Sequence, residues 1–472
     1  MFVGRQQQLA RLDGLLQRVR TDTDAKPGKA LLIRGRRRVG KSRLVEEFVD
    51  RIDVPHLFFA ATGRPARDEL RLFAEEVAAS NLPGAALFAG VELASWDAAF
   101  RLLAAALPDD GSVVVLDEVP YLVASDEGFE GTLQRAFDRE LARKRVLLIG
   151  IGSDLAMMEA LNSYGRPFHQ RATEMVVPPL TPAEVAELLD LPAADAFDAY
   201  LVTGGLPLIC NEWPTATPLM DYLGQALDDP TSALLVSGER SLAAEFPSDV
   251  QARTVLGAIG SGERTFSNIG RAAGDIPPGS LTRSLATLVE KRVVTVDEPL
   301  SVKPGSKDKR YRVADPYLRF WLSFLGPHLG EVERGRGDRV LARVRSSWTS
   351  WQGRAIEPVI REALERLAPP VLLDAKGVPG VVGGYWTRTN IPEIDIVVGD
   401  RAPVAKQVIA LGSIKWRENA PFDRHDLGEL HAYRTQLPGA AVDAPLIAVA
   451  RSGCTVDGVV HLTPEELIRA YE

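Results

Sequence analysis

The stretch "KALLIRGRRRVGKSRLVEEFV", residues Lys29–Val49, decides the fold. Ala30–Ile33 is a short apolar run of the kind that forms a buried parallel strand, and an amphipathic helix follows from Ser42. Between strand and helix, the spacing G-x-x-x-x-G-K-[ST] is matched without exception by Gly35, Gly40, Lys41 and Ser42. A strand, a glycine loop and a helix in this order predict an α/β protein with a P-loop parallel sheet at its core.

The loop predicts a bound nucleoside triphosphate. Glycines let backbone N–H groups curl around phosphates, and the helix N-terminus adds partial positive charge. We expect Lys41 to reach the β- and γ-phosphates and Ser42 to bind Mg²⁺. The same stretch supplies the other expected nucleotide contacts, Arg38, Val39 and Arg43. ATP and Mg²⁺ are the predicted cofactors.

A second apolar run, "SVVVLDEVPYL" (Ser112–Leu122), predicts a neighbouring central strand. Asp117 and Glu118 follow it at the carboxyl end, where open α/β sheets place their chemistry. Asp117 is the predicted second Mg²⁺ group, and Glu118 the base that orients the attacking water. A third strand ends at Ser153, which we expect either to sense the γ-phosphate, to cap a helix, or to do both.

Composition sets the outer bounds. With 472 residues, 46% hydrophobic and 25% charged, the chain has an ordinary globular composition and is long enough for two to four domains. Its two cysteines, Cys210 and Cys454, offer no disulfide framework. Because the start lacks an apolar signal region and no apolar run reaches spanning length, we expect a cytoplasmic protein without membrane contact.

The motifs resemble the archaeal-type P-loop ATPases, relatives of the STAND and AAA+ groups. "FVGRQQQL" (Phe2–Leu9) is similar to the box that borders the adenine in that family, and "VTGGLP" (Val202–Pro207) to a turn in its lid. "YGRPFHQR" resembles its G-R segment, which implies Arg166 as the arginine finger and Arg171 as the second candidate. The resemblance implies an ATPase core and lid over residues 1–226.

In residues 227–330, the apolar residues recur with a different spacing from that in the preceding segment. Three helices followed by two short strands resemble a winged helix, which implies DNA contact through the third helix and the wing. The expected phosphate contacts are Arg283, Lys291, Arg292, Lys307, Lys309 and Arg310. Phe246–Arg345 holds 17 Lys and Arg against 11 Asp and Glu in a chain of net charge −8, which favours a nucleic-acid partner. The alternative is a segment that only docks on the nucleotide core.

Residues 331–472 resemble the PD-(D/E)XK nuclease core. Glu357 lies in an amphipathic helix, Glu393 and Asp395 alternate along one strand, and Lys415 ends the next strand. In such cores, carboxylates bind a divalent ion and the lysine assists the nucleophile. Ser413 stands where an acid is expected, and a neutral hydroxyl is a poor ligand for a hard cation. We therefore expect a smaller, degenerate nuclease-like domain, with a second divalent metal only if another acid substitutes.

The acids that could replace the missing ligand are Glu393, on the same strand face, and Glu429, on the following helix. Three functions stay open from sequence. The favoured one is an ATPase that binds DNA through a winged helix and carries a degenerate nuclease-like domain. The second is an ATP-regulated metal nuclease. The third is a STAND-type signalling ATPase that forms ATP-dependent homo-oligomers and binds a protein partner.

Overall fold

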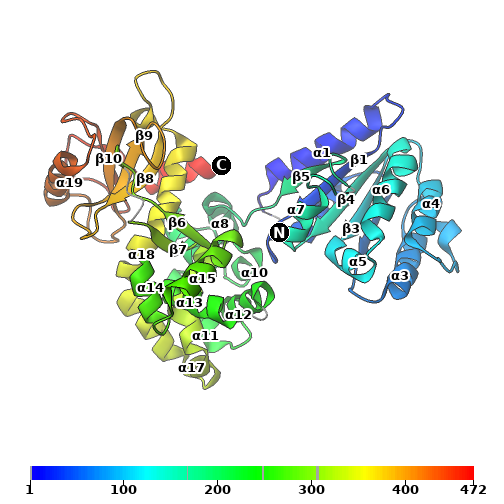
Figure 1. Cartoon of the computed structure of the whole chain (residues 1–472), viewed down its shortest axis with the longest axis horizontal. Helices are drawn as coiled ribbons and strands as arrows, with labels where there is room; N and C mark the ends of the chain where they lie inside the picture. Colours follow the sequence, from blue (N-terminus) through cyan, green and yellow to red (C-terminus); the bar gives the residue numbers. More distant parts are fainter. Residues whose placement is uncertain (1–2, 167, 247–248, 304–307) are drawn as a thin grey trace. The chain divides into compact units, whose positions relative to one another are not determined.

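The computed structural model describes residues 3–166, 168–246, 249–303 and 308–472. The chain divides into two compact units, Met1–Pro179 and Leu180–Glu472 (Figure 1). The predicted boundaries at residues 226 and 330 both fall inside the second unit. The division into three domains therefore stays a prediction.

The first unit is built on a five-stranded sheet in the order β2-β3-β4-β1-β5, in which every neighbouring pair is parallel. Its strands are β1 (Lys29–Arg34), β2 (His56–Ala60), β3 (Ser112–Asp117), β4 (Val146–Gly152) and β5 (Ala172–Val176). Its helices are α1 (Gln6–Thr21), α2 (Lys41–Arg51), α3 (Ala66–Ala79), η1 (Ala85–Phe88), α4 (Trp96–Ala106), α5 (Val119–Ser125), α6 (Phe129–Arg139), η2 (Leu141–Arg143) and α7 (Leu155–Leu161). The α/β fold with a parallel P-loop sheet is confirmed.

The central strands of the sheet are completely buried. Every residue of β3 and β4 is buried, as strands covered on both faces require. Phe73 of α3, Phe100 of α4 and Phe129 of α6 meet around Trp96, with ring centroids 5.2–5.7 Å from the indole. This aromatic group belongs to the same core cluster as residues of β1, β3 and β4, so it packs helices α3, α4 and α6 with the sheet in one core.

The helices of the second unit before its large sheet are α8 (Pro182–Leu189), α9 (Ala193–Thr203), α10 (Pro207–Cys210), α11 (Leu219–Asp228), α12 (Ala233–Glu245), α13 (Val250–Gly260), α14 (Phe266–Ala272), α15 (Pro278–Glu290), α16 (Pro316–Phe320), η3 (Trp321–Leu325), η4 (Gly326–His328), α17 (Leu329–Glu333) and α18 (Gly337–Leu367). Between α15 and α16, an antiparallel pair of strands is formed by β6 (Val294–Asp297) and β7 (Arg310–Val313). Three helices followed by a two-stranded ribbon are thus present in the predicted order.

The C-terminal sheet has the order β12-β11-β10-β9-β8. Its elements are η5 (Pro370–Leu372), β8 (Val381–Trp386), β9 (Glu393–Gly399), β10 (Val408–Lys415), α19 (Arg424–Gln436), β11 (Leu446–Ala450), β12 (Val460–Leu462), α20 (Pro464–Ile468) and η6 (Arg469–Tyr471). The pairs β8–β9 and β9–β10 are antiparallel, while β10–β11 and β11–β12 are parallel. Helix α18 contributes Ile356 and Ile360 to one core cluster, while Leu430 of α19 and Leu437, which directly follows that helix, belong to another.

Helix α9 joins this C-terminal core. Phe197 and Leu201 pack in the same cluster as α18 and the sheet. Asp198, 4% exposed, accepts hydrogen bonds from Trp416 Nε1 at 2.9 Å and from Gln352, and it forms an ion pair with Arg451. Helix α9, within the region predicted as core and lid, is thus bonded to residues that directly follow β10 and β11, more than 200 residues away in sequence. Among the described residues, no helix combines the length and apolar character needed to cross a membrane.

Candidate functional site

The glycine loop connects β1 to α2 in the first unit. A Cβ atom on Gly35 would lie 2.4 Å from the carbonyl oxygen of Val177, and Gly40 has φ +85°, so both positions require glycine. Lys41 is 5% exposed, and its Nζ donates to the carbonyl oxygens of Gly35 and Arg36 at 3.0 Å each. The lysine therefore closes the loop on itself and points its charge into the bend.

Asp117 and Glu118 lie beside this loop at the end of β3. Asp117 Oδ1 accepts from the Glu118 backbone N–H at 2.8 Å, and Ser42 also hydrogen bonds to this carboxylate. Burial raises the pKa of Asp117, while the hydrogen bond from Ser42 acts in the opposite direction. The two groups predicted to share Mg²⁺ are therefore in direct contact.

Ser153, just after β4, connects the lysine to the acid. Its Oγ accepts from Lys41 Nζ at 3.0 Å and donates to Glu118 Oε1 at 2.9 Å. Glu118 itself has φ +51°, a strained conformation for a residue with a side chain. Burial lowers the pKa of Lys41, and the charges of Glu118 and Asp117 partly offset that effect. The cap of α7 is Asp154, which accepts from the Met157 N–H, so the alternative capping role of Ser153 falls to its neighbour.

These residues fit a nucleoside triphosphate with Mg²⁺. A glycine loop before a helix N-terminus is a cradle for phosphates, and a hydroxyl next to a carboxylate offers the oxygen ligands that Mg²⁺ prefers. Mg²⁺ bound there would offset the charge on the phosphate oxygens. Glu118 lies at the mouth of the same loop and would accept a proton from water. The assignment of these roles stays a prediction.

The other predicted nucleotide contacts sit around the loop. Arg38 has φ +68° and Val39 is fully buried, while Arg43 is exposed and pairs along its own helix with Glu46 and Glu47 at 3.3 and 3.5 Å. Sequence reasoning missed Arg5, which is 4% exposed and donates to the Val39 carbonyl oxygen at 3.0 Å. A buried arginine in the N-terminal box thus holds the back of the loop.

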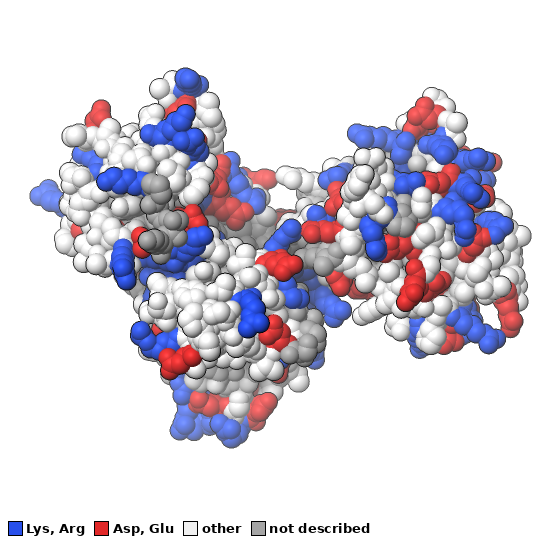
Figure 2. All heavy atoms as spheres, viewed as in Figure 1, with Lys and Arg blue, Asp and Glu red and all other residues white. Residues whose placement is uncertain are grey.

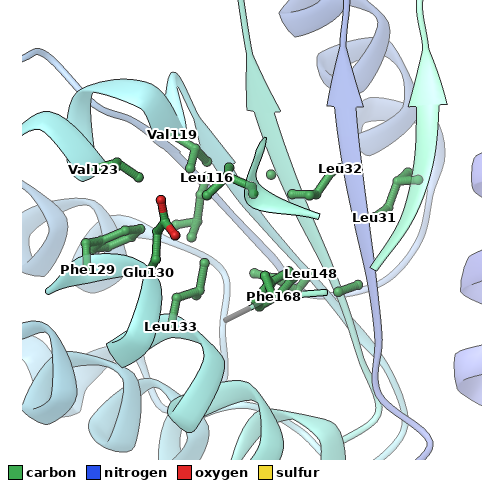
Figure 3. A pocket seen from close by; sticks show the side chains of 13 residues that line it. Leu31, Leu32, Leu116, Val119, Val123, Phe129, Glu130, Leu133, Leu148 and Phe168 are labelled. Carbon is green, nitrogen blue, oxygen red and sulfur yellow. The ribbon is translucent and has the colours of Figure 1, made fainter. Parts of the chain in front are cut away.

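The two arginine-finger candidates are paired elsewhere in the first unit. Arg166 forms an ion pair with Glu130, and Arg171 Nε lies 2.9 Å from Asp138. Figure 3 shows the Glu130 carboxylate among apolar side chains at a cavity of about 20 Å³ lined by residues such as Phe129 and Phe168. An acid in such surroundings needs its cation, which gives Arg166 a structural partner. Within the described part of the chain, the side-chain partners of both arginines thus lie outside the glycine loop.

The predicted C-terminal site is partly assembled. Glu357 of α18 and Asp395 of β9 line one largely buried corner. Asp395 Oδ2 accepts from Ser413 Oγ at 3.0 Å and from the Ile414 N–H at 2.8 Å. Burial raises the pKa of Asp395, and it raises the pKa of Glu357 to about 7, where the neighbouring Asp395 adds to the effect and Arg361 opposes it. Ser413 is therefore a donor to the carboxylate beside it.

Arg361 is the residue that sequence reasoning missed here. It lies one turn after Glu357, the i,i+4 spacing that lets two helical side chains meet. Its Nη2 donates to Glu357 Oε2 at 2.9 Å, and its Nε donates to the Asp395 carbonyl oxygen at 2.7 Å. The guanidinium thus supplies positive charge at the corner where the sequence predicts a metal ion.

Glu393 lines the same pocket as Glu357 and Asp395, but its carboxylate is bound by arginines, and Lys415 is paired with acids of α19. Glu393 Oε1 lies 2.6 Å from Arg310 and 3.4 Å from Arg264. Lys415 Nζ lies 3.2 Å from Asp426 and 3.7 Å from Glu429, so Glu429 is held on the lysine. Over the described part of the chain, no group of three or more His, Cys, Asp or Glu side chains could hold a metal ion. The expectation of a second divalent metal thus lacks a ligand cluster.

The residues predicted to contact phosphates in the three-helix segment differ in exposure and in their partners. Arg283, Lys291 and Arg292 are exposed. Lys309 pairs with Glu298 at 2.9 Å, and Lys307 lies outside the described residues. The prediction is wrong for Arg310, which is 8% exposed, is bonded to Glu393 and Asn390, and lies 4.3 Å from the centre of the Trp386 ring. Figure 2 shows basic and acidic side chains interspersed over the face in view.

Two family models match parts of the chain. Residues 2–210 match a family described as "ATPase domain predominantly from Archaea". Residues 321–427 match a family described as "Archaea bacterial proteins of unknown function". An uncharacterised protein of Methanocaldococcus jannaschii is 25% identical over 426 residues, 89% of this chain and 88% of the relative. The chain therefore carries an archaeal-type ATPase domain followed by a domain of the second family.

Solved structures similar to this chain include a Walker-type ATPase of Pyrococcus abyssi and the ORC2 protein of Aeropyrum pernix. The first is 19% identical, with 68% of this chain and 96% of that chain covered and a TM-score of 0.46. The second is 14% identical, with 72% and 95% covered and a TM-score of 0.47.

Proposed function

We propose that this ATPase is a nucleotide-driven switch that binds DNA through its second unit and does not cleave it. The observation that carries the ATPase part is the series of hydrogen bonds from Lys41 through Ser153 to Glu118, with Ser42 on Asp117 beside it. These bonds gather a phosphate-binding lysine, a metal-binding pair and a base in one loop mouth. A site of this kind can bind ATP and hydrolyse it.

The proposed DNA surface is a winged helix formed by α13–α15 with β6 and β7. Four basic residues of α14, α15 and the following turn are exposed, namely Arg271, Arg283, Lys291 and Arg292. Exposed arginine and lysine on and beside the third helix support phosphate contact, which supplies most of the affinity for DNA. Arg310 cannot contribute, since it is committed to Glu393.

The C-terminal sheet is proposed to be a nuclease-like domain without cutting activity. The pairing pattern of β8–β11, the position of α18 and the placement of Glu357 and Asp395 support the likeness. The guanidinium of Arg361 and the hydroxyl of Ser413 argue against cleavage, because they bind these acids without supplying a third acid.

The DNA part is tested with full-length protein and a fluorescent duplex of about 20 base pairs, at several salt concentrations, with and without ATP and Mg²⁺. We expect binding that weakens steeply with salt and hydrolysis that DNA stimulates. The double variant Arg283→Ala, Lys291→Ala should weaken binding and reduce the salt slope by about one for each phosphate group that is no longer neutralised. The matched control is Arg343→Ala, since Arg343 pairs with Glu331 on another part of the unit. The proposal would be contradicted if DNA did not change the rate of ATP hydrolysis and the duplex did not bind at low salt.

The chemistry is tested by two variants of the loop mouth and one of the C-terminal corner. We expect Lys41→Ala to lose nucleotide binding, and Glu118→Gln to keep binding while hydrolysis falls by about 10²-fold or more. DNA incubated with wild-type protein and Mg²⁺ or Mn²⁺ should remain intact. Cleavage that disappears in Asp395→Ala would show an active nuclease and overturn the proposed inactivity.

A further inference from the structure

The second unit contains a cavity of about 460 Å³ that is separate from the glycine loop. It is bounded by the end of α13, by β7, by α16 and η3, and by the middle of α18. Its polar lining includes five serines and four arginines, Arg264, Arg312, Arg319 and Arg354. No acidic side chain lines it among the described residues. Four arginines and five serines therefore line one space.

The arginines of this cavity are incompletely neutralised. Arg312 pairs with Asp297 at 2.8 Å, but Arg264 shares Glu393 with the closer Arg310 and stays 3.4 Å from it. Over the described residues, Arg319 and Arg354 have no carboxylate within ion-pair distance. Arg354 makes only long hydrogen bonds of 3.5 and 3.4 Å to Ser350. The lining of the cavity thus carries an excess of positive charge, which neighbouring carboxylates outside the lining offset only in part.

The cations also act on one another. Burial lowers the pKa of Arg319 to about 10; the charge of Glu357 raises it, and the charges of Arg312, Arg354 and Arg264 lower it further. Arg319 stays protonated at neutral pH, so its neighbours repel it in the absence of an anion. An anion placed among them would relieve that repulsion and gain charge-assisted hydrogen bonds.

We propose that this cavity binds a phosphate ester of nucleotide size. Guanidinium forks match phosphate oxygens in pairs, and serine hydroxyls complete such a site. The volume is within the range of small-ligand pockets, and larger than a phosphate group alone needs. The walls also hold Tyr311, Phe324 and Trp351, which offer an aromatic surface for a base. This site goes beyond the proposed ATPase and DNA surface.

The phosphate ester could come from a free nucleotide or from the 5′ end of a nucleic-acid strand. Calorimetric titrations of full-length Lys41→Ala protein separate these sources while disabling the glycine loop. The probes are inorganic phosphate, AMP, and a trinucleotide with a 5′-phosphate or a 5′-hydroxyl. A free-nucleotide site binds AMP at least as tightly as either trinucleotide. A strand-end site binds the 5′-phosphorylated trinucleotide about tenfold more tightly than its 5′-hydroxyl form.

The cavity is identified by variants in the same Lys41→Ala background. We expect Arg354→Gln, at an exposed position, and Arg319→Gln each to weaken the bound probe by about tenfold or more. Arg343→Gln on the same helix, outside the cavity, should bind as before. Arg319→Gln could disturb folding because Arg319 is largely buried. If the two variants give different results, the result for Arg354→Gln is therefore the decisive one. Binding of phosphate without preference for AMP or the phosphorylated trinucleotide, no binding at millimolar concentration, or binding unchanged in Arg354→Gln would each overturn the proposal.

Discussion

Glu357 shows how burial decides the state of a single carboxyl group. Its pKa is raised from 4.5 to about 7 by burial, although Arg361 opposes the effect. Between these two values the folded protein binds more protons at this site than the unfolded chain does. The contribution of this group to the free energy of unfolding therefore falls as the pH rises through this range, and it is lost above pH 7.

The expected loss from this group is on the order of 2–3 kcal/mol between about pH 4.5 and 8. Glu357→Gln removes the titration, so its free energy of unfolding should depend less on pH than that of the wild type. Urea unfolding at about pH 5, 6.5 and 8, followed by tryptophan fluorescence, measures this, because six of the seven tryptophans lie in the second unit. Glu362→Gln, at an exposed position on the same helix, is the control. An unchanged pH slope in Glu357→Gln would contradict the argument.

At the scale of elements, one buried acid joins α9 to the C-terminal sheet. Asp198 takes hydrogen bonds from Gln352 and Trp416 and pairs with Arg451, so three distant segments depend on one side chain. Its removal would leave Arg451, 11% exposed, without its buried partner.

We expect Asp198→Ala to lower the free energy of unfolding of the second unit by about 3 kcal/mol or more. Asp195→Ala is a matched control, since Asp195 also pairs with Arg451, at 2.7 Å, but is half exposed. That variant should cost about 1 kcal/mol or less. Chemical denaturation followed by tryptophan fluorescence compares the two. Equal losses would show that burial of Asp198 does not matter.

Local order is predictable where the signal lies in consecutive residues. The glycine loop, the acids after β3 and the order of three helices and a ribbon all follow from short stretches. Interactions across large sequence separations cannot be found in this way. A basic residue in a ribbon is usually exposed, which is why the pattern predicts a phosphate contact at Arg310, yet this side chain meets Glu393 83 residues away. The contact of Arg361 with Glu357 could have been predicted from the sequence, since the two residues have the i,i+4 spacing of an ordinary helical pair.

At the scale of the whole molecule, the nucleotide loop and the C-terminal corner belong to different compact units. The residues around Lys41 all lie in Met1–Pro179, and six of the seven tryptophans lie in Leu180–Glu472. A ligand held by the loop therefore stabilises the first unit directly, and any effect on the second unit requires coupling between the units.

We expect heating to give two unfolding transitions, of which ATP with Mg²⁺ raises the one that belongs to the first unit. At a ligand concentration about 100 times its dissociation constant, the gain is about 2.7 kcal/mol. Calorimetry gives both transitions, and tryptophan fluorescence assigns the second. Lys41→Ala should abolish the shift. If the fluorescence transition moves by as much as the other, the two units are strongly coupled and the independent response is wrong.

The arrangement of Arg361 and Ser413 determines which substitutions would be needed to form a metal site at this corner. An acid introduced at position 413 would lose the hydrogen bond that Ser413 donates to Asp395 and would place a second carboxylate beside it, while Arg361 still holds Glu357. Removing Arg361 alone would take from two largely buried acids the guanidinium that bonds Glu357 and lowers the pKa of both. Each single step is thus unfavourable or without effect, and only both together could open the corner to a cation. Arg361 and Ser413 thus act as a pair: changing either residue alone does not turn this corner of the sheet into a cation site.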